Sequence, residues 1–182
     1  MTKASAVDIA RTKLLSEFRW HGGHADVWRL FVNANVLSSL IDGLAEPWRE
    51  KGITHVLGIE SRGFLLGGAV AVSLGAGFQA IRKEAGMLPG PKVSVQSAPD
   101  YRSCAHLLRM QIVLRPGDVV LLVDDWAERG SQAVAARELV EMCGAHFAGV
   151  SILVDQLEDD VRAKLSRVTS LVLASELGDP DA

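Results

Sequence analysis

The sequence predicts an α/β fold with a doubly wound, mostly parallel β-sheet, and two observations carry this prediction. Short apolar runs that suit buried strands alternate with longer amphipathic segments that suit helices. The chain has 182 residues, 48% of them hydrophobic, which is enough for one substantial core and too short for two ordinary domains. We therefore expect a single domain that covers residues 1–182.

The N-terminal part should be helical. Residues 4–18 carry apolar side chains at helical spacing, and a loop containing two glycines follows at residues 20–24. A second helix is expected over residues 26–50, bent or restarted at Pro47. Residues 1–25 thus form a helix and a loop ahead of the alternating part of the chain.

Strands and helices alternate beyond this point. Strands are expected at residues 55–59, 78–83, 119–123, 147–154 and 168–174. Helices are expected at residues 63–74, 131–143 and 157–166. Ligands of doubly wound sheets bind at the carboxyl ends of the strands, so the loops at residues 60–62 and 124–130 are the candidate ligand-binding loops.

The alternation stops between Lys83 and Arg115. This stretch is rich in Gly, Pro and Ser and carries isolated charges. A segment of this length without its own pattern is usually a functional lid or hairpin, or is disordered. We expect residues 84–110 to form a mobile hairpin or lid.

Composition and charge narrow the classes of function. The formal net charge is −3 and the 19 basic residues are scattered among the acids, which argues against nucleic acid as the main partner. The longest apolar runs fall well short of the ~20 residues that a membrane-spanning helix needs. Cys104 and Cys143 lack the spacing of zinc ligands, and no secretory leader precedes them. We expect a soluble, cytoplasmic protein with no nucleic-acid or membrane partner and no metal-ligand set of its own.

The strongest local pattern covers residues 119–132. A hydrophobic strand runs into Asp124 and Asp125, whose carboxylates can accept hydrogen bonds from a pair of sugar hydroxyls, and we expect both to be solvent-accessible. The loop after them opens a helix, whose free backbone N–H groups and dipole favour a phosphate, and Gly130 allows close approach. From these residues alone, the alternative is that the aspartates only solvate a strand end and cap the helix.

Four segments resemble motifs of the type I phosphoribosyltransferases, most closely the adenine phosphoribosyltransferases. Residues 119–132 resemble the motif that binds phosphoribosyl pyrophosphate (PRPP), and residues 58–64 resemble the pyrophosphate loop. Residues 81–91 resemble the strand that enters the mobile catalytic loop, and residues 115–118 resemble the turn before the PRPP strand. The segments follow the order and spacing of the family, so chance agreement at all of them is improbable.

The resemblance implies an enzyme that transfers ribose 5-phosphate from PRPP to a purine base, adenine or an analogue, and releases pyrophosphate. It implies catalytic roles for Arg62, Asp100 and Asp125, and ribose contacts for Asp124 and Asp125. The 5′-phosphate-binding residues that it implies are Ala127, Glu128, Arg129, Gly130, Ser131 and Gln132. The pyrophosphate-binding residues that it implies are Glu60, Ser61, Arg62, Arg82 and Lys83. It further implies base contacts by Phe18 and Arg19 in an N-terminal hood, Mg2+ bound through PRPP, and a homodimer.

Departures from the family pattern leave alternatives open. The hydroxyl that usually grips the 5′-phosphate is lost at Arg129, although Ser131 can replace it, and Asp100 is one methylene shorter than the usual acid of the mobile loop. Trp20 stands where the family has an aspartate beside the base. Glu128 brings a negative charge into the phosphate loop, so we expect its side chain to point away from the phosphate or to pair with an arginine. A non-catalytic PRPP or nucleotide sensor of the same fold, and a phosphoribosyltransferase for a different base, are the alternatives.

Overall fold

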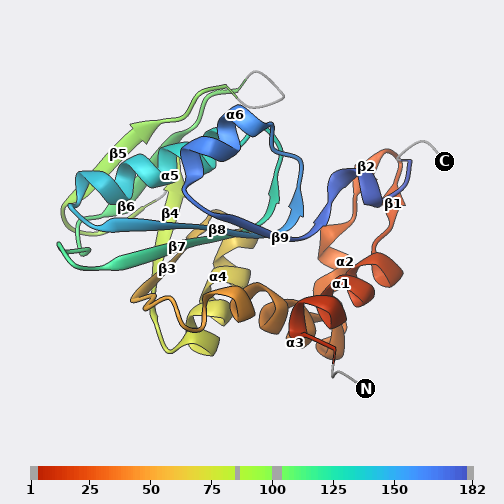
Figure 1. Cartoon of the computed structure of the whole chain (residues 1–182). Helices are drawn as coiled ribbons and strands as arrows, with labels where there is room; N and C mark the ends of the chain where they lie inside the picture. The colour runs from red at the N-terminus through yellow and green to blue at the C-terminus, as the bar shows by residue number, and fades with distance from the viewer. Residues whose placement is uncertain (1–3, 85–86, 100–103, 180–182) are drawn as a thin grey trace.

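A seven-stranded sheet with the order β5-β6-β4-β3-β7-β8-β9 forms the centre of the computed structural model, which describes residues 4–84, 87–99 and 104–179 (Figure 1). The parallel strands are β3 (His55–Ile59), β4 (Gly77–Lys83), β7 (Val119–Ala127), β8 (His146–Asp155) and β9 (Val168–Leu173). The antiparallel hairpin of β5 (Lys92–Gln96) and β6 (Leu107–Gln111) extends the sheet beyond β4. The predicted α/β fold with a mostly parallel sheet is confirmed.

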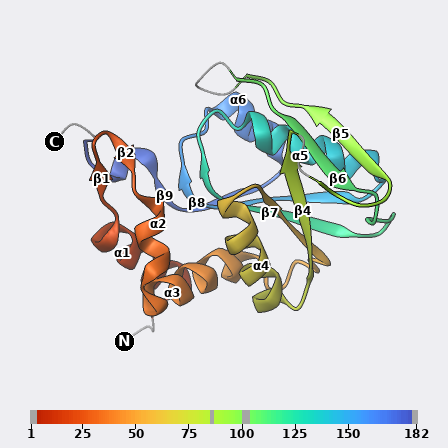
Figure 2. The same ribbon diagram turned by 180° about the vertical axis from the view of Figure 1, so that it is seen from behind.

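Helices cover both faces of this sheet, as the two opposite views show (Figures 1 and 2). One face carries α1 (Ala6–Glu17), α2 (Val27–Val32), α3 (Ala34–Ala45) and α4 (Arg62–Leu74). The other face carries α5 (Ser131–Met142) and the short α6 (Asp159–Arg162). The remaining short elements are the hairpin β1 (Trp20–His21) and β2 (His24–Ala25) and the 3-10 turns Glu46–Trp48, Ala163–Leu165 and Ala174–Glu176.

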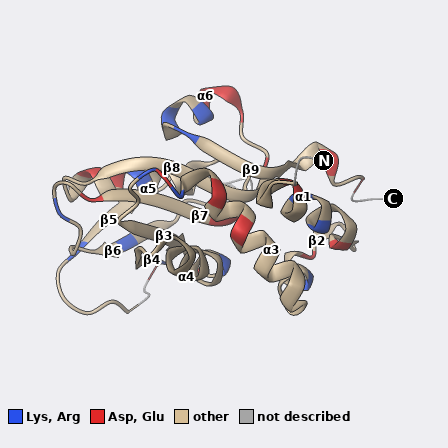
Figure 3. Cartoon of the chain, turned by 60° about the horizontal axis from the view of Figure 1, so that its bottom comes forward, with Lys and Arg blue, Asp and Glu red and all other residues tan. Residues whose placement is uncertain are grey.

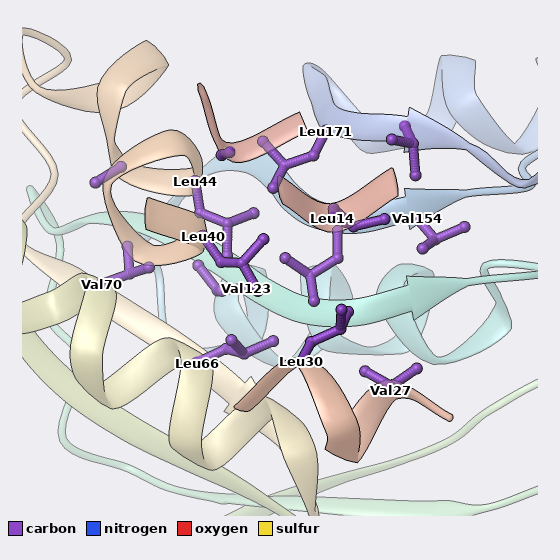
Figure 4. Close-up of a cluster of buried hydrophobic side chains, with 14 of the residues drawn as sticks. Leu14, Val27, Leu30, Leu40, Leu44, Leu66, Val70, Val123, Val154 and Leu171 are labelled. Carbon is purple, nitrogen blue, oxygen red and sulfur yellow. The ribbon is translucent and has the colours of Figure 1, made fainter. Parts of the chain in front are cut away.

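The alternation of side chains along β7 divides the core into two layers. Val120 and Leu122 belong to the buried cluster under α5, whereas Val123 belongs to the cluster on the opposite face. Figure 4 shows Val123 near Leu44 of α3 and Leu66 of α4. The first five residues of β7, Val119–Val123, form an unbroken apolar run, as is usual for parallel strands that are buried on both faces.

The predicted helix over residues 26–50 is wrong in one respect, since it divides at Asn33. The Asn33 side chain accepts hydrogen bonds from the backbone N–H groups of Asn35 (2.9 Å) and Val36 (3.4 Å), so it caps the start of α3 directly after α2 ends. Pro47 lies in the 3-10 turn that follows α3. The charged segment at residues 157–166 likewise forms only the four residues of α6 and a 3-10 turn.

The segment at residues 84–110 contains more regular structure than predicted. Strand β6 pairs with β4 on one side and β5 on the other, and its Leu108 and Met110 are 0% exposed. The pattern Val93-Ser94-Val95 of β5 has the period of two that identifies strands, although the run is short. The predicted hairpin is therefore present as β5 and β6, whereas its mobility stays a prediction.

Charged side chains are scattered over the described part of the chain. Figure 3 shows acidic and basic segments spread over helices and loops of the described chain without one sign gathering on one element. Among the described residues, no helix is both long and apolar enough to span a bilayer.

Glycines allow α4 to approach β3 within backbone contact. A Cβ atom at Gly58 of β3 would lie 2.1 Å from the carbonyl oxygen of Gly63, in the first turn of α4. One turn later, a Cβ atom at Gly67 would lie 3.1 Å from the carbonyl oxygen of Leu57. Gly68, by contrast, faces open space, with nothing within 4 Å of the added atom.

We predict opposite effects for alanine at two of these glycines. Gly58→Ala should lower the free energy of unfolding by about 1–3 kcal/mol or more, because the clash is with backbone and only a shift of α4 relieves it. Gly68→Ala should raise it by up to about 1 kcal/mol, because alanine is the better helix former and meets no neighbour. Urea unfolding followed by circular dichroism measures both, and equal midpoints for the two variants would contradict the packing described here.

Candidate active site

A cavity of about 900 Å3 opens at the carboxyl ends of β3, β4 and β7. The strand order reverses there, since β4 follows β3 on one side while β7 lies on the other, and such reversals are the usual ligand sites of open α/β sheets. The residues predicted from the sequence that line it are Glu60, Ser61, Arg62, Lys83, Asp124, Asp125, Ala127, Glu128, Arg129, Gly130, Ser131 and Gln132. The structure thus brings three separate loops of the sequence to one cavity.

Asp124 and Asp125 lie inside β7 rather than in a loop after it. The strand pairs with β8 as far as Ala127, so both aspartates belong to the paired part of the strand. Asp124 is half-buried, but Asp125 is only 5% exposed. The expectation that both aspartates are solvent-accessible is therefore wrong for Asp125.

Arg62 is the cation that accompanies the buried Asp125. It is the first residue of α4, and its Nε lies 2.7 Å from Asp125 Oδ2. That oxygen is buried and accepts no hydrogen bond within the described part of the chain, so the charge of Arg62 is its compensation. The predicted functional residues Arg62 and Asp125 therefore act as a pair in the free protein.

Asp124 lacks such a partner among the described residues. Its Oδ1 accepts a hydrogen bond of 2.9 Å from the backbone N–H of Asp125. Burial, and then the negative charge of Asp125, raise the pKa of Asp124 well above its ordinary value. The cavity thus holds one carboxylate that is neutralised by an ion pair and one that takes up a proton more readily than usual.

The pyrophosphate residues predicted from the sequence divide into two groups. Arg82 is outside the cavity lining, because its Nε and Nη2 donate to the two carboxylate oxygens of Glu60 at 3.1 and 2.9 Å. Glu60 also accepts from the backbone N–H of Lys83, and the bonds from Arg82 lower the pKa of Glu60. The Lys83 side chain, Ser61 and Arg62 remain as the lining residues that can face a ligand from this side.

The predicted phosphate loop leads from the end of β7 into α5. Gly130 precedes the helix with φ of 65°, a left-handed conformation, and no side chain caps the helix start. The first bond of the helix runs from Val134 N to Gly130 O, so the N–H groups of the residues between have no intrahelical acceptor. An uncapped helix start with no acid in its first turn favours an anion there.

The two predicted base-binding residues lie outside the cavity lining, and their contact with a base stays a prediction. Phe18 is buried and outside the cavity lining, and the Arg19 guanidinium donates to the backbone oxygens of Ser16 (2.7 Å) and Phe18 (2.6 Å). The aromatic residues that do line the cavity are Trp20 and Trp126, whose ring centroids lie 6.0 Å apart. Phe18 packs edge-on against Trp20, with the two ring centroids 5.3 Å apart.

Sequence reasoning missed several lining residues. Trp126 lies inside the motif recognised at residues 119–132, and this position was the signal that could have identified it as a lining residue. Val27 of α2 and Gln156 after β8 carry no local signal, because only the fold brings them to the cavity. The predicted catalytic Asp100 lies outside the described residues.

Comparisons with known proteins agree with this geometry. No protein-family model matches the chain. The chain is 40% identical over 130 residues to the adenine phosphoribosyltransferase of Phocaeicola vulgatus, covering 71% of this chain and 74% of the relative. It is 42% identical over 134 residues to the adenine phosphoribosyltransferase of Nocardioides sp., covering 71% of each.

Solved structures give the same result over nearly the whole chain. The adenine phosphoribosyltransferase of Rhodothermus marinus superposes with a TM-score of 0.80 at 31% identity, covering 91% of this chain and 98% of that one. The enzyme of Saccharomyces cerevisiae, complexed with an imino-altritol bisphosphate and adenine, superposes with a TM-score of 0.72 at 30% identity, covering 90% and 98%. The cavity, the order of its motifs and these likenesses agree, and the chain belongs to the adenine phosphoribosyltransferase family.

Proposed function

We propose that this protein transfers ribose 5-phosphate from PRPP to adenine or a closely related purine and releases pyrophosphate. One observation carries the proposal: the carboxylates of β7, the uncapped start of α5 and the cations Arg62 and Lys83 line a single cavity. These groups suit the sugar hydroxyls, the 5′-phosphate and the pyrophosphate of one ligand. The family relatives have the same activity in their names.

Different groups of the cavity bind different parts of PRPP. Asp124 and Asp125 accept hydrogen bonds from the ribose hydroxyls, while the free N–H groups after Gly130 and the Ser131 hydroxyl donate to the 5′-phosphate. These contacts hold the sugar at two ends, so its reacting carbon is oriented toward the base. Orientation of this kind lowers the entropic part of the barrier.

The departing pyrophosphate needs positive charge. Lys83 supplies a point charge from the end of β4, and Arg62 supplies one from the start of α4. The positive charge that develops on the ribose must also be kept from water, and we expect the chain between β4 and β6 to cover the cavity during the reaction.

Mg2+ is the metal that we propose, bound through PRPP. Among the described residues, no three His, Cys, Asp or Glu side chains gather into a set that could hold a metal. This donor chemistry fits Mg2+, which keeps waters and binds through one or two carboxylates and substrate phosphates rather than in an all-protein cage. Asp124 and Asp125 are the carboxylates beside the ligand, and the ion would neutralise the leaving pyrophosphate.

We further propose a cytoplasmic homodimer whose ligands are PRPP and a purine, without nucleic-acid or membrane partners. The cytoplasmic location rests on the sequence, in which the two cysteines, Cys104 and Cys143, lack the spacing of a disulfide or zinc framework. Leu65 and Val72 on α4 and Phe78 on β4 are exposed apolar side chains, and we expect a second copy to cover them. Light scattering should give about twice the chain mass of 19.5 kDa.

A panel of purines and pyrimidines, incubated with PRPP and Mg2+ and followed by mass detection of nucleotides, tests the proposal. We expect adenosine monophosphate as the main product. A product from another base alone would favour the phosphoribosyltransferase for a different base. PRPP binding without any product would favour the sensor.

Two single variants, Asp124→Asn and Asp125→Asn, should change the free energy of unfolding in opposite directions. Both variants should bind PRPP more weakly. Asp124 is protonated more readily when folded than when unfolded, so the parent loses stability as pH rises through that interval. Asp124→Asn should therefore raise the free energy of unfolding by about 0.5–2 kcal/mol at neutral pH, and the gain should shrink at lower pH. Asp125→Asn leaves Arg62 unpaired and should destabilise the protein.

Urea unfolding at several pH values and titration with PRPP check this pair of variants. Each carboxylate lost from the ribose should weaken PRPP binding by about 1.5–3 kcal/mol. Unchanged PRPP affinity in the double variant would show that the ribose site is misplaced.

Two variants of the phosphate loop should also differ. Ser131→Ala should weaken PRPP binding by about 1 kcal/mol, because a hydroxyl donor is lost. Glu128→Ala should leave the affinity unchanged or raise it modestly, because a carboxylate near a phosphate opposes binding. Calorimetric titration with PRPP measures both, and the reverse result would remove this loop from the site.

A further inference from the structure

The segment that follows β8 lies directly behind the phosphate loop. A Cβ atom at Gly130 would lie 2.6 Å from Leu157 Cδ2 and 2.7 Å from Val161 Cγ1. Leu157 is buried and Val161 packs against the same core cluster. These two side chains therefore form the wall against which the left-handed Gly130 and the start of α5 are held.

A buried acid attaches this segment to the sheet. Asp155, the last residue of β8, is 3% exposed. Its Oδ1 accepts a hydrogen bond of 2.9 Å from the backbone N–H of Leu157, and its Oδ2 lies 2.8 Å from Nη1 of Arg162 at the end of α6. Both carboxylate oxygens are thus engaged, as a buried charge requires. One contact is to Leu157, which faces Gly130, and the other is to Arg162, the residue after Val161.

The same segment also fixes the last residues of β7. The backbone N–H of Gln156 donates to Ala127 O at 2.9 Å, and its side-chain Oε1 accepts from Trp126 Nε1 at 3.0 Å. The indole that lines the cavity and the loop that begins one residue later are therefore tied to residues 155–162. Of residues 155–162, only Gln156 lines the cavity beside Asp124 and Asp125, so the others act only through the loop.

We propose that Asp155 and Arg162 are positioning residues for the 5′-phosphate loop, holding Leu157 and Val161 against Gly130 so that the free N–H groups of α5 stay aimed at the phosphate. The inference rests on the proposed function, because it assumes that the phosphate binds at this helix start. Binding by preset donors loses affinity when the donors are free to move, even if every donor is still present. The loop holds the phosphate equally before and during the reaction, so its loosening should act on binding rather than on turnover.

Arg162→Gln tests the inference, with Arg49→Gln as the matched control. Arg49 also pairs with a carboxylate, Asp42, and donates to Ser73 O, but it is outside the cavity lining. We expect Arg162→Gln to raise the KM for PRPP and the Kd for ribose 5-phosphate about tenfold or more, with kcat and the KM for adenine changed less than about twofold. Arg162→Lys should recover part of the loss, and Arg49→Gln should change Tm but neither constant.

The ribose 5-phosphate titration separates the possible failures. If the parent protein does not bind this probe, the proposed function fails and the inference fails with it. If the parent binds it and Arg162→Gln binds it equally well, only the positioning role is overturned. Val161→Ala, which keeps the ion pair and removes part of the wall, serves if Arg162→Gln does not fold, and an unchanged Kd in that variant likewise overturns the inference.

Discussion

The backbone contact between β3 and the first turn of α4 determines where the ligand-binding groups stand. Gly58 and Gly63 leave no room for a side chain between strand and helix, and a Cβ atom at Gly63 would also lie 3.1 Å from Asp124 Oδ1. This closeness places Arg62 at the start of α4 against Asp125 of β7. A residue with a side chain at either glycine would push α4 away from the sheet and would separate Arg62 from Asp125.

The carboxylates of β7 show that stability and ligand binding make opposing demands on this strand. The apolar run before them is buried on both faces and strengthens the core, whereas Asp124 and Asp125 add two neighbouring carboxylates to the same strand, one half-buried and one buried. Asp125 is compensated by Arg62, but Asp124 depends mainly on one backbone N–H. Carboxylates with few hydrogen-bond donors around them are typical of functional sites. A ligand that supplies the missing donors binds favourably, because it satisfies carboxylate oxygens that the free protein leaves without partners.

The phosphate loop owes its shape to residues that do not touch the ligand. Gly130 allows the left-handed turn, but the position of that turn is decided by Leu157 and Val161 behind it. These side chains are held in turn by the buried Asp155. The helix start is uncapped, so its donors are available to an anion only while this packing keeps them in place.

The sequence alone predicted the alternation of elements, the parallel sheet and half of the residues that line the cavity, because periodicity and motif spacing are local properties. It could not predict that β7 continues to Ala127 and buries Asp125, that Arg82 is occupied by Glu60, or that Trp20 and Trp126 replace Phe18 and Arg19 at the cavity wall. Each of these depends on a partner far away in the chain. Burial, ion pairing and the contacts behind a loop are properties of packing, and only the tertiary structure decides them.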